Sequence, residues 1–134
     1  MGRKLAITVV VPTYQRPDDL KRCLEALAQQ TRLPDEVIVC VSDSDLEEPT
    51  LLERWTRAYR FPTAFRAATV NRPGLSAARA QGTILAKGDI VCFTDDDSRP
   101  HPDWLERIEE HYQNPEVGGV GGQDVVYLDG ARCK

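Results

Sequence analysis

The most restrictive feature of the sequence is a regular alternation of short apolar runs with segments of helical periodicity. Residues 5–11 form a continuously apolar run that is rich in β-branched side chains and too short to cross a bilayer. Such runs are typical of strands buried on both faces. The next segment opens with Pro17 and carries Leu20, Leu24 and Leu27 at helical spacing. This order predicts βαβ crossovers, and hence an α/β fold with a mostly parallel sheet flanked by helices.

The alternation continues along the rest of the chain. Ser76 is expected to cap a helix that Gly88 ends. The chain shows no repeat, linker or low-complexity tract, so we expect one domain over residues 1–134. We expect further strands at 37–41, 65–70, 90–94 and 117–127, the last interrupted by glycines, and further helices at about 47–59, 76–87 and 102–112.

Charge and cysteine content exclude several kinds of protein. The net charge of -4 argues against a nucleic-acid binder, and the absence of a basic block argues against electrostatic attachment to a membrane. The cysteines form no CxxC pair and are not spaced with the histidines as zinc ligands. We therefore expect reduced, structural cysteines in a cytoplasmic protein. The four are Cys23, Cys40, Cys92 and Cys133.

An acidic run, Asp95-Asp96-Asp97, directly follows the apolar strand expected at 90–94. Three adjacent carboxylates repel one another unless a positive group sits among them. Hard divalent cations take such oxygen ligands, so the run predicts Mg²⁺ or Mn²⁺ held by one or two carboxylates and a diphosphate. If strand geometry persists, Asp95 and Asp97 point the same way, and Asp96 is free to bind a sugar hydroxyl. A solvated acidic turn is the alternative.

Other polar segments are expected at the same edge of the sheet, because ligands of open α/β sheets bind at the carboxyl ends of the strands. In the loop 12–17, Tyr14 could stack on a nucleobase and Arg16 could pair with a phosphate, although a plain prolyl connector is the alternative. Segment 71–79 feeds a helix N-terminus, which favours anions, or is simply a capped helix that packs through alanines. Arg79 could reach a phosphate or form a salt bridge with the acidic run.

Taken together, these segments resemble family 2 glycosyltransferases of the GT-A fold. The resemblance implies a Rossmann-like GT-A sheet, a nucleotide-diphospho-sugar donor that is often a UDP-sugar, and a divalent metal. It further implies inverting transfer of the sugar to a hydroxyl of a glycan, lipid or other acceptor. The matching residues follow the family's order and spacing between about Ile7 and Gly122, at 9–16, 71–82, 88–97 and 102–105.

The resemblance also implies roles for single residues. Asp97, together with Asp95, would hold the metal, and Asp96 would contact the ribose. The chain has Ser42-Asp43-Ser44-Asp45 where the family usually has Asp-Asp-Gly-Ser, so Asp45 rivals Asp43 as the contact to the base. The full nucleotide-binding set implied is Pro12, Thr13, Tyr14, Arg16, Asp43, Asn71, Arg79, Asp95 and Asp96.

Members of the family usually continue beyond the length of this chain, and the resemblance places the general base beyond Lys134. No catalytic residue is therefore assigned, and we interpret residues 1–134 as the N-terminal, donor-binding portion of a larger or truncated enzyme. The full-length enzyme could lie peripherally at the inner membrane surface. A sheet edge exposed by truncation would favour a homodimer.

Two other functions remain open. One is a truncated module that binds a nucleotide-sugar without transferring it. The other is a phosphoacceptor domain of the response-regulator kind, which also clusters carboxylates around Mg²⁺. That arrangement draws its acids from two strands and adds a lysine, whereas the three acids here follow one strand.

Overall fold

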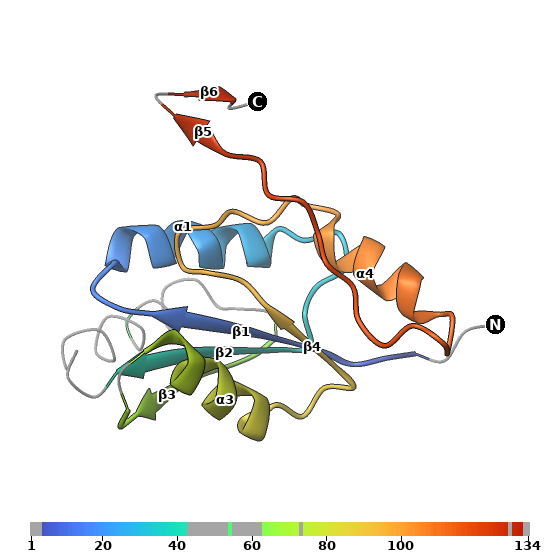
Figure 1. Cartoon of the computed structure of the whole chain (residues 1–134), viewed down its shortest axis with the longest axis horizontal. Helices are drawn as coiled ribbons and strands as arrows, with labels where there is room; N and C mark the ends of the chain where they lie inside the picture. The colour runs from blue at the N-terminus through green and yellow to red at the C-terminus, as the bar shows by residue number, and fades with distance from the viewer. Residues whose placement is uncertain (1–3, 43–53, 55–62, 73, 129, 133–134) are drawn as a thin grey trace.

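A parallel four-stranded sheet forms the centre of the computed structural model, which describes residues 4–42, 54, 63–72, 74–128 and 130–132 (Figure 1). The strand order is β3-β2-β1-β4, and each neighbouring pair is parallel. The predicted α/β class is thereby confirmed. The strands are β1 (Ile7–Thr13), β2 (Glu36–Ser42), β3 (Ala64–Val70) and β4 (Ile90–Phe93).

Helices cover both faces of this sheet. Helices α1 (Pro17–Ala28) and α4 (Trp104–Tyr112) lie on one face, and α3 (Leu75–Leu85) lies on the other (Figure 1). Successive strand residues point to opposite faces, so each buried strand feeds both layers. The larger core, under α1 and α4, contains Ile7, Val9, Val11, Leu20, Leu24, Leu27, Val37, Val39, Val41, Leu105 and Ile108. The smaller core, under α3, contains Val10, Ile38, Cys40, Val70 and Ala78.

The central position of β1 explains why its sequence is apolar without interruption. All seven of its residues are buried, because β2 and β4 pair with its two edges and helices cover both faces. β3 is an edge strand, and its residues are mostly exposed or half-buried. The buried central strand thus fixes the position of everything that follows its carboxyl end.

Helix α3 begins and approaches the sheet at two glycines. Gly74 is the residue before the helix and has φ 106°, a backbone region that favours glycine. At Gly82 a Cβ atom would lie 2.3 Å from Cγ1 of Val10, so the absent side chain lets α3 press against β1. The prediction that Ser76 caps this helix is wrong, because Leu75 is already its first residue.

A cluster of polar groups links the amino ends of the strands through hydrogen bonds. The carboxylate of Glu36 accepts hydrogen bonds from the Thr8 hydroxyl at 2.8 Å, the Lys87 N–H at 2.9 Å and the Arg66 guanidinium at 2.9 Å. The Gly88 N–H donates to the Thr8 hydroxyl at 2.9 Å. Gly88 therefore joins this cluster instead of ending α3, which terminates at Leu85. We call Glu36, Thr8, Arg66 and the N–H groups of Lys87 and Gly88 the amino-end cluster.

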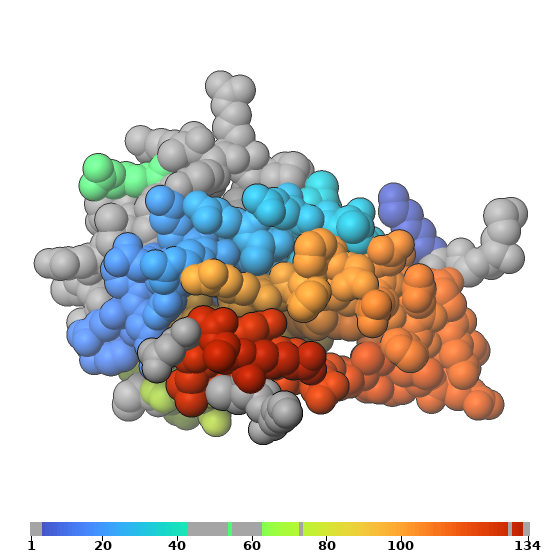
Figure 2. Space-filling model, turned by 90° about the horizontal axis from the view of Figure 1, so that it is seen from above, coloured from blue at the N-terminus to red at the C-terminus, as the bar shows by residue number. Residues whose placement is uncertain are grey.

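The prediction of a strand at 117–127 is wrong. The described chain has no regular secondary structure over 117–126, and only a small antiparallel hairpin follows, β5 (Tyr127–Leu128) with β6 (Ala131–Arg132). Glycines at 118, 119, 121 and 122 supply no side chains for packing and weaken a strand. The hairpin stands away from the sheet on the side of α1 (Figure 1), and in the view from above its red atoms lie in front of the rest of the molecule (Figure 2).

The helix expected at about 47–59 lies outside the described residues, apart from Arg54. None of the helices in the described part of the chain has the length and apolar character that crossing a bilayer requires.

Candidate functional site

The carboxyl ends of β1 and β4 bring the acidic run and the loop before α1 together. This loop is residues 14–16, shorter than the expected 12–17, because Pro12 and Thr13 are still part of β1 and Pro17 begins α1. The two strands are hydrogen-bonded neighbours, so the residues that leave them emerge side by side. β4 ends at Phe93, and the Ser98 N–H donates to the carbonyl of Asp95 at 3.1 Å, which closes a turn. We call Asp95–Asp97 the acidic turn. Because it is no longer a strand, simple alternation does not decide where its side chains point.

The middle carboxylate of the acidic turn points inward. Asp96 is 6% exposed and accepts a hydrogen bond from the Thr13 hydroxyl at 3.0 Å. Burial raises the pKa of Asp96, while the Thr13 hydroxyl, the positive charge of Arg16 and the Tyr14 N–H oppose that rise and the charge of Asp97 adds to it. Asp96 is thus anchored to the end of β1 and fixes the position of the turn.

The two outer carboxylates point toward solvent, and each meets an arginine. Arg16 Nη1 lies 3.1 Å from Asp97 Oδ2 and 3.5 Å from Asp96 Oδ1. Arg79 Nη2 lies 3.3 Å from Asp95 Oδ1, so the salt bridge that the sequence left open is present. The positive charge that three adjacent carboxylates require therefore comes from two sides, from the loop before α1 and from α3.

The backbone of the loop explains how Arg16 reaches the acidic turn. Gln15 has φ 50°, which is uncommon for a residue other than glycine and turns the chain between β1 and α1. Tyr14 precedes this bend and is 55% exposed, so its ring is open to a stacking partner. Pro12 is buried within β1, two residues before Tyr14.

A cysteine lies beneath the acidic turn. Cys23 on α1 is fully buried, and its Sγ donates to the carbonyl of Asp95 at 3.5 Å. Burial and then the negative charges of Asp96, Asp95 and Asp97 raise the pKa of Cys23 to about 12. The thiol is therefore protonated at neutral pH and packs as a small apolar group. The sequence predicts a reduced, structural thiol at Cys23 but gives no sign of its contact with the acidic turn.

The acidic turn offers an incomplete set of metal ligands. Among the described residues, no three side chains of His, Cys, Asp or Glu converge to enclose a cation. Asp95 and Asp97 nevertheless present half-exposed carboxylates, and Mg²⁺ sites often combine one or two carboxylates with phosphate oxygens of a ligand. The residues present therefore fit a hard divalent cation that a diphosphate helps to hold.

The remaining nucleotide-binding candidates are Asn71 and Asp43. Asn71 is exposed at the end of the edge strand β3, which β2 separates from β1. Asp43 and its rival Asp45 lie outside the described residues. The structure thus gathers Thr13, Tyr14, Arg16, Arg79 and the acidic turn at one edge. Asn71 lies at the same edge of the parallel sheet, on the far side of β2 from β1.

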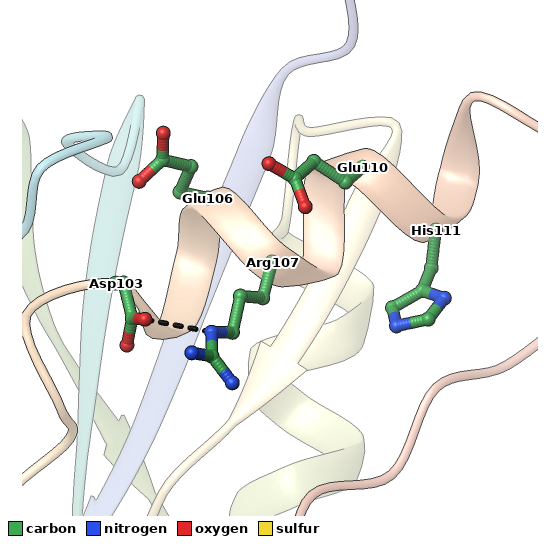
Figure 3. Close-up of a pocket in the computed structure, with 5 residues that line it drawn as sticks. All are labelled: Asp103, Glu106, Arg107, Glu110 and His111. Atoms are coloured by element: carbon green, nitrogen blue, oxygen red, sulfur yellow. Dashed lines mark hydrogen bonds and ion pairs between the residues drawn. The ribbon is translucent and has the colours of Figure 1, made fainter.

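A polar hollow, separate from the acidic turn, lies on the surface of α4. Figure 3 shows its lining, which comes from a single helix and the residue before it. Its one ion pair joins Arg107 Nε to Asp103 Oδ2 at 2.6 Å, one helical turn apart. The N–H of Thr31, just beyond the end of α1, donates to the carbonyl of Pro102, just before α4. The hollow therefore lies at the opposite end of the sheet from the acidic turn. The lining residues are Asp103, Glu106, Arg107, Glu110 and His111.

Comparison with protein families gives one match over almost the whole chain. The model described as Glycosyl transferase family 2 matches residues 8–132. A glucosyl-dolichyl phosphate glucuronosyltransferase from Haloferax volcanii is 30% identical over 121 residues, which cover 88% of this chain and 38% of that protein. Glycosyltransferase AglE from the same organism is 30% identical over 129 residues, covering 92% of this chain and 41% of the relative. The chain therefore spans well under half the length of either relative.

Solved structures give the same fold. The mannosyltransferase PcManGT from Pyrobaculum calidifontis, solved in complex with GDP-Man and Mn²⁺, superposes with a TM-score of 0.77 at 28% identity. The superposed part covers 87% of this chain and 34% of that protein. TarS from S. aureus, residues 1–349, superposes with a TM-score of 0.69 at 20% identity and supports the fold alone. It covers 90% of this chain and 39% of that one, so the likeness again concerns part of a longer protein.

Proposed function

Because the chain belongs to glycosyl transferase family 2, we propose that it binds the nucleotide-diphospho-sugar donor of an inverting glycosyltransferase. The donor sits at the carboxyl ends of β1 and β4, with a UDP-sugar as the first to test. The observation that carries the proposal is the acidic turn between two arginines, at the edge where open α/β sheets bind ligands. The GDP-Man and Mn²⁺ complex of PcManGT supports the same class of donor and metal.

The nucleoside end of the donor is assigned to the loop after β1. The exposed ring of Tyr14 stacks on the base, beside the buried Pro12. Asp96 accepts a hydrogen bond from a ribose hydroxyl through the lone pairs that Thr13 leaves free. The Thr13–Asp96 bond holds this carboxylate in place before the ligand arrives.

The diphosphate end is assigned to the two arginines and the outer carboxylates. Arg16 and Arg79 carry planar guanidinium groups, which bind phosphate oxygens as readily as carboxylates. Asp97, with Asp95, is assigned to Mn²⁺ or Mg²⁺. When bound, the cation offsets the charge that develops on the leaving diphosphate. The acceptor is a hydroxyl of a glycan, lipid or other molecule, and no general base for it is assigned among the described residues.

Calorimetry tests this proposal most simply. UDP is titrated into the wild-type protein and into Asp97→Ala, with Mn²⁺ and with EDTA, and GDP is titrated in parallel. We expect metal-dependent binding in the wild type and roughly a 100-fold weaker affinity in Asp97→Ala. Removing a residue that binds the metal directly should cost at least as much as removing one that only hydrogen-bonds to such a residue. Equal binding in EDTA would contradict the metal role.

A matched variant controls for the loss of one carboxylate. Asp103→Ala removes a partly exposed aspartate from an Arg–Asp pair at the other end of the sheet. Its nucleotide binding should equal that of the wild type. Release of UDP from a UDP-sugar, with and without hydroxyl acceptors, then separates transfer from binding alone.

A further inference from the structure

Arg16 contacts two carboxylates of the acidic turn at once. Its Nη1 lies 3.1 Å from Asp97 Oδ2 and 3.5 Å from Asp96 Oδ1. Only one of these carboxylates is anchored by the protein, because Asp96 is buried against Thr13 while the Asp97 side chain is 52% exposed. Asp97 is therefore the carboxylate that can change its partner without disturbing the fold.

We propose that Arg16 is an internal counter-cation that competes with the divalent metal for Asp97 and moves to the donor diphosphate when the donor binds. This inference rests on the proposed function and assigns a means of regulation to the same site. Its consequence is that metal and nucleotide bind cooperatively, because either one breaks the Arg16–Asp97 ion pair. The metal binds the Asp97 carboxylate and releases the Arg16 guanidinium for the diphosphate, and the diphosphate binds the guanidinium and releases the carboxylate for the metal.

The geometry suits such an exchange. Both side chains of the Arg16–Asp97 pair are about half exposed, 54% and 52%, so the pair is partly screened by water and breaks easily. The guanidinium fork recognises carboxylate and phosphate oxygens in the same planar way, so Arg16 has an equivalent partner on either side. An ammonium group would lack that fork.

Arg79 provides an internal comparison. It pairs with Asp95 at 3.3 Å, but it projects from the regular helix α3, and its Nε is buried without a hydrogen-bond partner among the described residues. Arg16 instead follows the left-handed Gln15, in the loop before α1. Arg16 also forms ion pairs with two members of the acidic turn, Asp96 and Asp97, whereas Arg79 pairs with Asp95.

The affinity for Mn²⁺ in the absence of nucleotide distinguishes this exchange from a role of Arg16 in phosphate binding alone. If Arg16 only bound phosphate, its removal would weaken UDP binding and leave the affinity for Mn²⁺ alone unchanged. If Arg16 competes with the metal, its removal strengthens Mn²⁺ binding in the absence of nucleotide. By linkage, the factor by which UDP and Mn²⁺ enhance each other's binding must then fall.

The test measures Mn²⁺ binding by the electron paramagnetic resonance signal of the free ion, first without nucleotide and then with UDP. In Arg16→Gln we expect Mn²⁺ alone to bind about fivefold more tightly, the upper range for loss of one exposed ion pair. The enhancement by UDP should fall by at least a similar factor. Arg16→Lys keeps the positive charge but lacks the planar guanidinium group, so its affinity for Mn²⁺ should lie between those of the wild type and Arg16→Gln.

Arg22→Gln is the matched control. It removes the same charge from an Arg–Asp pair of 3.3 Å and similar exposure, on α1 and outside the acidic turn. Its Mn²⁺ affinity should equal that of the wild type, and circular dichroism should show all variants folded.

The outcomes separate this inference from the function on which it rests. Equal Mn²⁺ affinities in the wild type and Arg16→Gln, with UDP still bound through the metal, would overturn the competition and leave the proposed function standing. Equal tightening in Arg22→Gln would likewise overturn it, since the effect would then be one of net charge. If no variant binds Mn²⁺ at all, the proposed metal role fails first, and the inference fails with it.

Discussion

Two buried carboxylates at opposite ends of the sheet show contrasting electrostatics. Glu36 at the amino end is 7% exposed and Asp96 at the carboxyl end is 6% exposed. Burial raises the pKa of both groups, but at Glu36 the Lys87 N–H, the Thr8 hydroxyl and Arg66 outweigh it, so its pKa is lowered overall. The pKa of Asp96 remains raised, because its donors do not outweigh burial and the neighbouring charge of Asp97.

The difference separates a structural network from a site open to a ligand. In the amino-end cluster, donors on three different segments meet the Glu36 carboxylate at 2.8 to 2.9 Å. At the acidic turn, three charges share two arginines at 3.1 to 3.5 Å, and the outer pairs are about half exposed. Like charges left close together at one edge cost stability, which is typical of functional sites. We therefore expect mutations at the two ends to affect different measurements.

The largest effect on stability should come from Glu36→Ala. The substitution leaves the Thr8 hydroxyl and the Lys87 N–H without their acceptor and separates Arg66 from its carboxylate. We expect a loss of about 3 kcal/mol in the free energy of unfolding, because two donors lose their acceptor and a partly buried ion pair is broken. Urea denaturation measures it.

The comparison variant is Asp97→Ala, which should change the free energy of unfolding by no more than about 0.5 kcal/mol, because it removes an exposed side chain that faces like charges. Equal destabilisation by the two variants would break the distinction between the two ends. Glu36→Gln keeps one acceptor oxygen and should fall between them.

A smaller effect should appear as a dependence of stability on pH. The pKa of Glu36 in the folded protein lies below its ordinary value of 4.5, because its hydrogen bonds and Arg66 outweigh the effect of burial. Its contribution is fully present above the unfolded pKa and is lost as the pH falls through the lowered, folded pKa. We therefore expect the free energy of unfolding to decline below about pH 5.

Denaturation of Glu36→Gln over the same pH range isolates this contribution. Its decline should be shallower than that of the wild type, although Asp35, whose pKa is also lowered, keeps part of it. Parallel curves for the two proteins would show that Glu36 does not stabilise the folded state in the manner described.

Much of the fold is predictable because the core strands carry continuous apolar runs. The observed bounds of β1, β2, β3 and β4 differ from the expected ones by no more than two residues. The strand expected at 117–127 fails because its apolar residues do not form a continuous buried face: Val120 packs against the larger core, but Val126 and Tyr127 are more than half exposed. A pattern of residue types does not distinguish a paired strand from an exposed segment when glycines separate its apolar residues.

The candidate site is predictable in location but not in its internal contacts. Parallel topology alone brings the acidic turn and the loop after β1 to one edge, which the sequence indicates correctly. The contact of Arg16 with Asp97 depends on the left-handed backbone at Gln15 and on the neighbouring places of β1 and β4. Neither is visible in local sequence. The contact of Cys23 with the acidic turn is hidden for the same reason, since it joins residues that lie far apart in the sequence.

The most direct test of the difference between the two ends is to locate the bound metal. Mn²⁺ is added with UDP to the ¹⁵N-labelled protein, and the loss of each amide signal through paramagnetic broadening is measured. We predict that the signals of residues 13–16 and 95–98 disappear first, while those of Glu36 and of the α4 hollow persist. Broadening centred on Glu106 and Glu110 of that hollow, or on the amino-end cluster, would contradict the account.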